Sequence, residues 1–149
     1  MARVYLKGLP QLKAKLRKLA ELAEPTMRKV MAEAASKVVV EIRSRAKWQH
    51  IIDSIGWTFG IPPKYSQRLA QVQAGGLQVT IYVGGPDARD AAWHEHGTRP
   101  HIVGGRFAGA VHPGTAAQPF FFPGWRAKRN EVRKMLREAI RAAVLKAAR

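Results

Sequence analysis

Two long stretches of this chain, one at each end, carry apolar residues at three- and four-residue spacing. In the first stretch these positions are Leu9, Leu12, Leu16, Leu19 and Ala23, followed after Pro25 by Met27, Met31, Ala34, Val38 and Ile42. In the last stretch they are Trp125, Val132, Leu136, Ile140, Val144 and Ala147. Such spacing lines up apolar side chains on one face of an α-helix. We predict helices over about 10–23 and 25–46, with Pro25 starting a new helix or kinking the first, and a last helix from about Pro123.

The middle of the chain has the pattern of a small antiparallel sheet. Residues 77–83 alternate between apolar and polar types, and the turn Gly75-Gly76 joins them to 68–73. Alternation of period two beside such a turn predicts a β-hairpin. Further β-prone residues, which predict strand structure, are Ile51, Ile52, Ile55, Trp57 and Phe59. We also predict a short strand at 4–6 and a short helix over 87–96 that stops at Gly97.

Residues 98–118 are rich in Gly, Pro and His, and they predict a long loop without regular structure. A loop of this length in a compact domain is usually functional, or mobile until a partner orders it. No repeat or linker divides the chain. We therefore predict one α+β domain over residues 1–149, in which a small antiparallel sheet packs against a long N-terminal helical region and a C-terminal helix.

The net charge of +16 is concentrated at the two ends of the chain. Residues 1–47 contain 12 Lys and Arg against 4 Asp and Glu, and residues 123–149 contain 9 against 2, whereas residues 48–122 contain 5 against 4. Charge of this kind favours an acidic partner, either nucleic acid or an acidic protein surface. The alternative is that Lys and Arg only solvate the outer faces of amphipathic helices.

The chain lacks the patterns of common enzyme and membrane classes. Without cysteine, disulfides and thiolate zinc sites are excluded. No apolar run approaches the roughly 20 residues of a membrane span, and the first residues are too charged for a signal peptide. Nucleophile-elbow, Walker and dinucleotide-binding motifs are also missing. Asp87 and Asp90 are explained by a favourable place at a helix start. We expect no catalytic residues, no cofactor and no membrane contact.

One histidine cluster raises the possibility of a metal-dependent enzyme. His94, Glu95 and His96 stand together, and imidazole and carboxylate groups bind zinc and other transition metals. On a helix, however, ligands are expected four residues apart, and two residues two apart point to different sides. On a strand they would share a face. We expect no native metal site here, and hydrogen-bonded histidines are the alternative.

The segment Ala92-Trp93-His94-Glu95-His96-Gly97-Thr98-Arg99-Pro100-His101, followed by His112-Pro113-Gly114-Thr115-Ala116-Ala117-Gln118-Pro119-Phe120, forms a recognisable pattern. It resembles the small tail-component proteins of long-tailed phages (siphoviruses), which sit at the neck and help to join head and tail. The family pattern is Glu-x-Gly-Thr, a variable loop, a Pro-Gly-Thr-like turn, and Gln-Pro-Phe opening the last helix. A Gly-Leu-x-x-Leu start also matches at Gly8, Leu9 and Leu12. The family's Pro-x-Asp-Thr-Gly-x-Leu segment is reduced here to Ser54-Ile55.

The resemblance implies a structural virion protein, assembled in the host cytoplasm. Copies would form a homo-oligomeric ring, sixfold or a multiple of six, between the head connector and the tail-terminator or tail-tube proteins. Non-specific contact with DNA in the channel is possible, and a non-specific nucleic-acid-binding protein is the alternative function. The residues implied as motif or interface are Trp93, Glu95, Gly97, Thr98, Arg99, His101, Arg106, Phe107, His112, Gly114, Gln118, Pro119 and Phe120.

Physical chemistry suggests roles for several of these positions. Gly97 suits a helix stop at positive φ, and Pro119 forces Gln118 into an extended shape before the last helix. Three phenylalanines at 120–122 cannot all point inward, so we expect at least one to meet a neighbouring subunit, unless all are buried in one fold. Residues 98–118 are expected to form an arm towards a subunit or partner, ordered on assembly.

Overall fold

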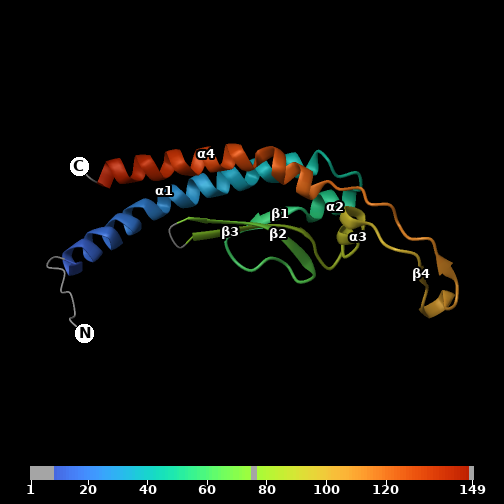
Figure 1. The fold of residues 1–149 in the computed structure, drawn as a ribbon. Coiled ribbons are helices and arrows are strands. Elements are labelled where there is room, and N and C mark those ends of the chain that lie inside the picture. The colour runs from blue at the N-terminus through green and yellow to red at the C-terminus, as the bar shows by residue number, and fades with distance from the viewer. Residues whose placement is uncertain (1–8, 75–76, 148–149) are drawn as a thin grey trace, which may run out of the picture.

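The computed structural model describes residues 9–74 and 77–147 and places two long helices side by side over a small sheet (Figure 1). The helices are α1 (Leu9–Arg43) and α4 (Phe121–Ala147), which run antiparallel. The predicted strand at 4–6 and the predicted turn Gly75-Gly76 lie outside the described residues. Among the residues that are described, no helix is long and apolar enough to cross a membrane.

Helix α1 is continuous through Pro25, so a new helix does not start there. Pro25 is exposed, as is Glu21, whose carbonyl loses its helical partner at the proline. Water can bond that carbonyl, and Arg28 forms an exposed ion pair with Glu24 at 3.9 Å across the same part of the helix. Beyond the proline the predicted apolar stripe is confirmed, because its residues Met27, Met31, Ala34, Val38 and Ile42 are all buried. The side chains of Leu9, Leu12, Leu16 and Leu19 lie outside the described set.

The sheet has three antiparallel strands in the order β1-β3-β2. Strand β2 (Ser66–Ala74) pairs with β3 (Leu77–Gly84), which confirms the predicted hairpin, and β1 (Gly56–Thr58) pairs with the other edge of β3. A register shift between Arg68 and Ala70 marks a bulge in β2. The central strand is buried over most of its length, including Val79, Ile81 and Val83.

The β-prone run after α1 forms a helix where strand structure was predicted. Residues Gln49–Ser54 make the short helix α2, and only Gly56–Thr58 is a strand. Ile51 and Ile55 are four residues apart, and both are buried. A helical turn places both side chains on the side that faces the core. A hydrogen bond of 2.9 Å from Gln49 Nε2 to Asp53 Oδ1 supports the same turn.

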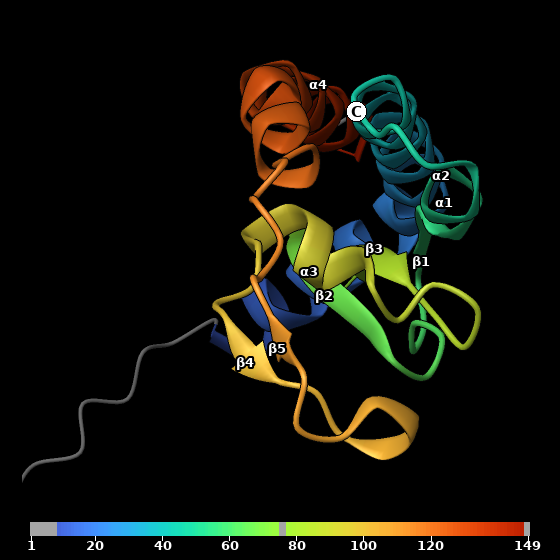
Figure 2. The same ribbon diagram turned by 90° about the vertical axis from the view of Figure 1, so that its right-hand side faces the viewer.

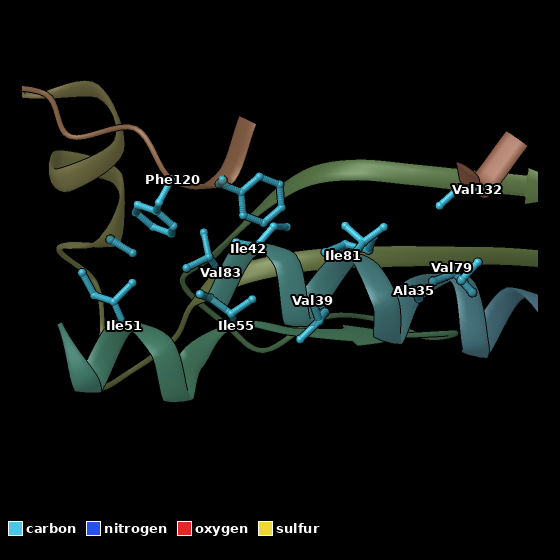
Figure 3. Close-up of a cluster of buried hydrophobic side chains, with 14 of the residues drawn as sticks. Ala35, Val39, Ile42, Ile51, Ile55, Val79, Ile81, Val83, Phe120 and Val132 are labelled. Atoms are coloured by element: carbon cyan, nitrogen blue, oxygen red, sulfur yellow. The ribbon is translucent and has the colours of Figure 1, made fainter. Parts of the chain in front are cut away.

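Side chains from both layers meet in one hydrophobic core (Figure 3). Helix α1 contributes Val39 and Ile42, the central strand contributes Ile81, and α4 contributes Val132. The residues at the α2 end are Ile51, Ile55, Phe120 and Phe121. The predicted α+β fold is therefore confirmed, and one core joins the first and last helices of the described chain to the sheet.

Gly124 lets α1 and α4 approach closely, and we expect Gly124→Ala to destabilise the protein. A Cβ at this position would lie 2.8 Å from Ile42 Cγ1 and 3.1 Å from Ile42 Cα. Overpacking costs about 1–3 kcal/mol, and the gain in helix propensity of about 1 kcal/mol offsets it only in part. Denaturant unfolding should show a net loss of up to about 2 kcal/mol. The double variant Gly124→Ala/Ile42→Ala should lose clearly less stability than the sum of the losses of the two single variants. Strict additivity would contradict a contact between the two residues.

Candidate functional site

The carboxylate of Glu95 closes the start of the last helix. Glu95 lies on α3 (Ala91–His96), only 3% exposed. Its Oε2 accepts hydrogen bonds from the backbone N–H groups of Phe120 and Phe121 at 2.7 and 2.9 Å, and its Oε1 accepts one from Phe122 at 3.1 Å. A negative charge is favourable at this end of a helix, and bonds to a charged acceptor are the stronger kind.

Two prolines reduce the number of backbone donors that need a partner at this helix start. Residues 119 and 123 are both proline and have no N–H to satisfy, so only the three phenylalanine donors remain between them. The next donor, Gly124 N–H, bonds to Phe120 O at 3.2 Å and begins the regular helical pattern. Every donor that a helix start normally leaves unpaired is therefore either bonded to Glu95 or removed by proline.

After α3, residues 98–118 form a projecting loop whose two ends meet, and we call this segment the arm. The two sides of the arm meet at an antiparallel bridge between Thr98 and Thr115. Thr98 N–H donates to Thr115 O at 2.9 Å, and Thr115 N–H donates to Thr98 O at 3.2 Å and to Thr98 Oγ1 at 2.9 Å. Gln118 N–H then donates to His94 O at 2.8 Å. These bonds tie both ends of the arm to α3.

Gly97 and Gly114 allow the two sides of the arm to come together. Gly97 ends α3 at φ 71° and ψ 173°, which confirms the predicted helix stop at positive φ. A Cβ there would lie 2.7 Å from Thr115 O and 2.8 Å from Ala117 N. Gly114 has φ +89°, and a Cβ on it would collide with Thr98 O. Side chains at either position would push the arm open.

The arm contains regular structure, although its sequence predicted none. Strands β4 (His101–Ile102) and β5 (Val111–His112) pair antiparallel, and a short 3-10 helix, Gly105–Phe107, lies between them. The arm projects beyond the end of the helices and the sheet (Figures 1 and 2). Its apolar side chains face solvent: Ile102 is 72% exposed, Phe107 68% and Val111 74%.

The structure separates the residues that the sequence pattern singled out into two groups. The group at the base of the arm consists of Glu95, Gly97, Thr98, Gly114, Gln118, Pro119 and Phe120. The other group lies outside this base and is exposed, as Pro119 also is; it consists of Trp93, Arg99, His101, Arg106, Phe107 and His112. Phe120 and Phe121 are buried, and Phe122 is half-buried, so at most one of the three is available to a neighbour.

The neighbouring residues His94, Glu95 and His96 on α3 point in different directions. Glu95 faces the start of α4, and the His96 ring lies 6.0 Å from that of Phe122. His94 instead points to Asp90, with 3.1 Å between His94 Nε2 and Asp90 Oδ2. His50, on α2, brings its Nε2 to 2.9 Å from the same oxygen. In the described part of the chain, His94, Glu95 and His96 do not form a common ligand set.

Asp90 and His50 are functional candidates that sequence reasoning missed. Asp90 is the N-cap residue of α3, at the helix start where it was predicted, but its side chain makes no capping bond and contacts His50 and His94 instead. Burial raises the pKa of Asp90, but the hydrogen bonds and charge of His50, with a smaller contribution from His94, outweigh it and hold that pKa below its usual value. The four-residue spacing of Asp90 and His94 was the available signal; nothing local points to His50.

A basic face on α4 lies away from the arm base. A shallow surface hollow there is lined by Asn130, Arg133, Lys134, Arg137, Glu138 and Arg141. The exposed Lys37 forms an ion pair with Glu131 at 3.5 Å between the two long helices. Exposed pairs of this kind contribute little to stability. Four cations and one carboxylate line the hollow, and this excess of positive charge favours acidic groups.

Comparison with known proteins gives one family. The model of the HK97-gp10-like family, described as "Bacteriophage HK97-gp10, putative tail-component", matches residues 11–97. This range covers most of α1, the sheet and α3, and it ends at Gly97 just before the arm. Neither the curated proteins nor the solved structures contain a significant match.

Proposed function

The chain belongs to the HK97-gp10-like family of phage tail components, and from this we propose that it is a neck or tail-completion subunit. Copies form a ring, sixfold or a multiple of six, that joins the head connector to the tail-terminator or tail-tube proteins. A tail component is part of the virion, and we propose assembly in the host cytoplasm. We propose a structural role, and the buried Glu95 carboxylate supports it by accepting hydrogen bonds from three backbone donors.

The arm is the observation that carries this proposal. Its base is tied to α3 and α4, so the apolar residues Ile102, Phe107 and Val111 are held out from the body in a defined direction. Exposed apolar groups gathered on a projection mark a protein contact. An arm on each copy that reaches a different surface on the next copy makes a heterologous contact, which is the kind that closes into rings.

Val111→Asp tests the arm as a contact between subunits. A carboxylate in the core of an interface lacks a partner and loses its water, so we expect ring assembly to weaken about tenfold or more. The purified protein is mixed with its cognate head-connector and tail-tube proteins, and rings and joined particles are counted by negative-stain electron microscopy. Sedimentation at several concentrations gives the oligomeric state of each variant alone.

Val40→Asp is the matched control, because Val40 is also exposed but lies on α1. It should assemble like the unchanged protein. Equal assembly by the unchanged protein, Val111→Asp and Val40→Asp would show that the arm is not part of the contact between subunits. Persistent monomers of the unchanged protein, without binding to either cognate partner, would count against the ring itself.

The basic face on α4 favours non-specific nucleic-acid binding as a second function. Arg133, Lys134, Arg137 and Arg141 can contact phosphates, and such binding needs only positive charge. Duplex DNA binding by the isolated protein, falling steeply with salt, would support this function. Retention of that binding in Val111→Asp would separate it from assembly through the arm.

A further inference from the structure

We propose that His50, Asp90 and His94 form a binding site for a divalent transition-metal ion, and that zinc fits it best. His50 comes from α2, whereas Asp90 and His94 come from the start and the body of α3. Within the described chain this is the one group of three such side chains whose ligand atoms all lie within 4.8 Å of one another. The site is independent of the proposed role in the virion.

The distances between the ligand atoms suit one ion. A tetrahedral zinc ion with bonds of about 2.0–2.1 Å keeps its ligand atoms roughly 3.3–3.5 Å apart. Nε2 of His50 and Nε2 of His94 lie 2.9 and 3.1 Å from the same oxygen of Asp90. The two histidine ligand atoms lie within 4.8 Å of each other, so a widening of a few tenths of an ångström at Asp90 brings the three ligand atoms near the spacing that one ion requires. His50 is exposed and on a short helix, so its side chain can move by that amount.

The surroundings hold two ligands in place and leave one side open. The His94 ring packs on Trp48 with 3.7 Å between ring centroids, and Asp90 is four residues before it on the same face of α3. The third ligand, His50, is exposed and also lines a surface hollow of about 270 Å³, which neither Asp90 nor His94 lines. A water from solvent on the His50 side can complete the coordination.

The donor set selects the class of metal. Two imidazoles and one carboxylate suit zinc and the other late transition metals, whereas magnesium and calcium require mostly oxygen ligands. Non-specific attraction of cations is unfavourable on a chain with a net charge of +16. Stoichiometric uptake of zinc would therefore report a built site.

One of the two histidine ligands, His94, lacks the outer hydrogen bond that usually supports a histidine ligand. Nδ1 of His94 is buried without a hydrogen-bond partner. Loss of such a partner typically costs 10–100-fold in metal affinity. We therefore expect binding weaker than at a structural zinc site. The ion would join α2 to α3 through His94, the residue before Glu95. Because it binds only the folded protein, it should also raise the thermal stability.

The test is a calorimetric titration of zinc into the tag-free full-length protein, with thermal melting in zinc and in magnesium. We expect one zinc per chain, a melting temperature raised by zinc and unchanged by magnesium, and a visible absorption band with Co²⁺. His50→Ala, an exposed change that leaves the core alone, should weaken zinc binding about tenfold or more. Asp90→Asn should do the same, and far-UV circular dichroism checks the fold of both variants.

The double variant His101→Ala/His112→Ala is the matched control. These rings stack across the arm with centroids 5.1 Å apart and are the other close histidine pair in the described chain. Zinc binding should survive their removal. No stoichiometric binding by the unchanged protein, binding unaffected by both His50→Ala and Asp90→Asn, or binding lost only in the double variant would each overturn the proposal.

Discussion

Glu95→Ala should destabilise the protein by about 3–5 kcal/mol. The substitution leaves the backbone N–H groups of Phe120, Phe121 and Phe122 without their acceptor, and the first two belong to buried residues. Each buried donor left unpaired costs about 1–3 kcal/mol, and the favourable charge at the helix start is lost as well. Guanidinium unfolding monitored by circular dichroism measures the change.

Two further variants separate the carboxylate from the volume of the side chain. Glu95→Gln keeps the shape and one acceptor oxygen but turns an amide NH₂ towards the donors, so it should lose about half as much. Glu138→Ala, at an exposed position on the same α4, should stay within about 0.5 kcal/mol of the unchanged protein. A Glu95→Ala protein as stable as the Glu138→Ala protein would show that water satisfies the start of α4.

Gly97→Ala should cost about 3–5 kcal/mol. The glycine has φ 71° and ψ 173°, a region that is essentially restricted to glycine and costs other residues about 1–3 kcal/mol. The new Cβ would also approach backbone atoms of Thr115 and Ala117 below 3 Å, which adds an overpacking cost of similar size. Relief of that contact requires the arm to separate from α3, which faster amide hydrogen exchange at Thr98 and Thr115 would report.

Gly109→Ala is the control that measures the cost of backbone strain without a steric contact. Gly109 also has a positive φ, of +92°, but a Cβ there meets nothing within 4 Å. We expect a loss of about 1–2 kcal/mol from backbone conformation alone, and unchanged exchange at the base of the arm. Equal losses at positions 97 and 109 would mean that the close approach of Thr115 contributes nothing.

Local periodicity was enough to predict the main elements of the fold. The apolar stripe of α1 beyond Pro25, the β2–β3 hairpin and the last helix all follow from spacing within one element. The errors arose where tertiary packing overrides propensity. Ile51 and Ile55 are β-prone, yet burial of both on one side made a helix. Pro25 sits on an exposed face, where the lost hydrogen bond is cheap enough for the helix to continue.

The sequence pattern located the base of the arm but could not reveal what its residues do. Glu95 was selected as part of a motif, whereas its three donors stand 25 to 27 residues later in the chain. His50 and Asp90 are 40 residues apart, a separation that no helical or strand period connects. The short strands of the arm were missed because two-residue strands leave no readable alternation.

The packing of α1 against α4 also has a consequence for biosynthesis. During translation α1 leaves the ribosome early, and its partner α4 leaves roughly eighty residues later. Until then the stripe that includes Met31, Val38 and Ile42 lacks the helix that covers it in the finished protein. Native contacts between segments so distant in the chain form slowly, and apolar surface exposed meanwhile favours aggregation. A chain truncated before α4 would thus keep this apolar surface exposed. Chaperones and proteases can recognise that surface and so distinguish the truncated chain from the complete protein before assembly.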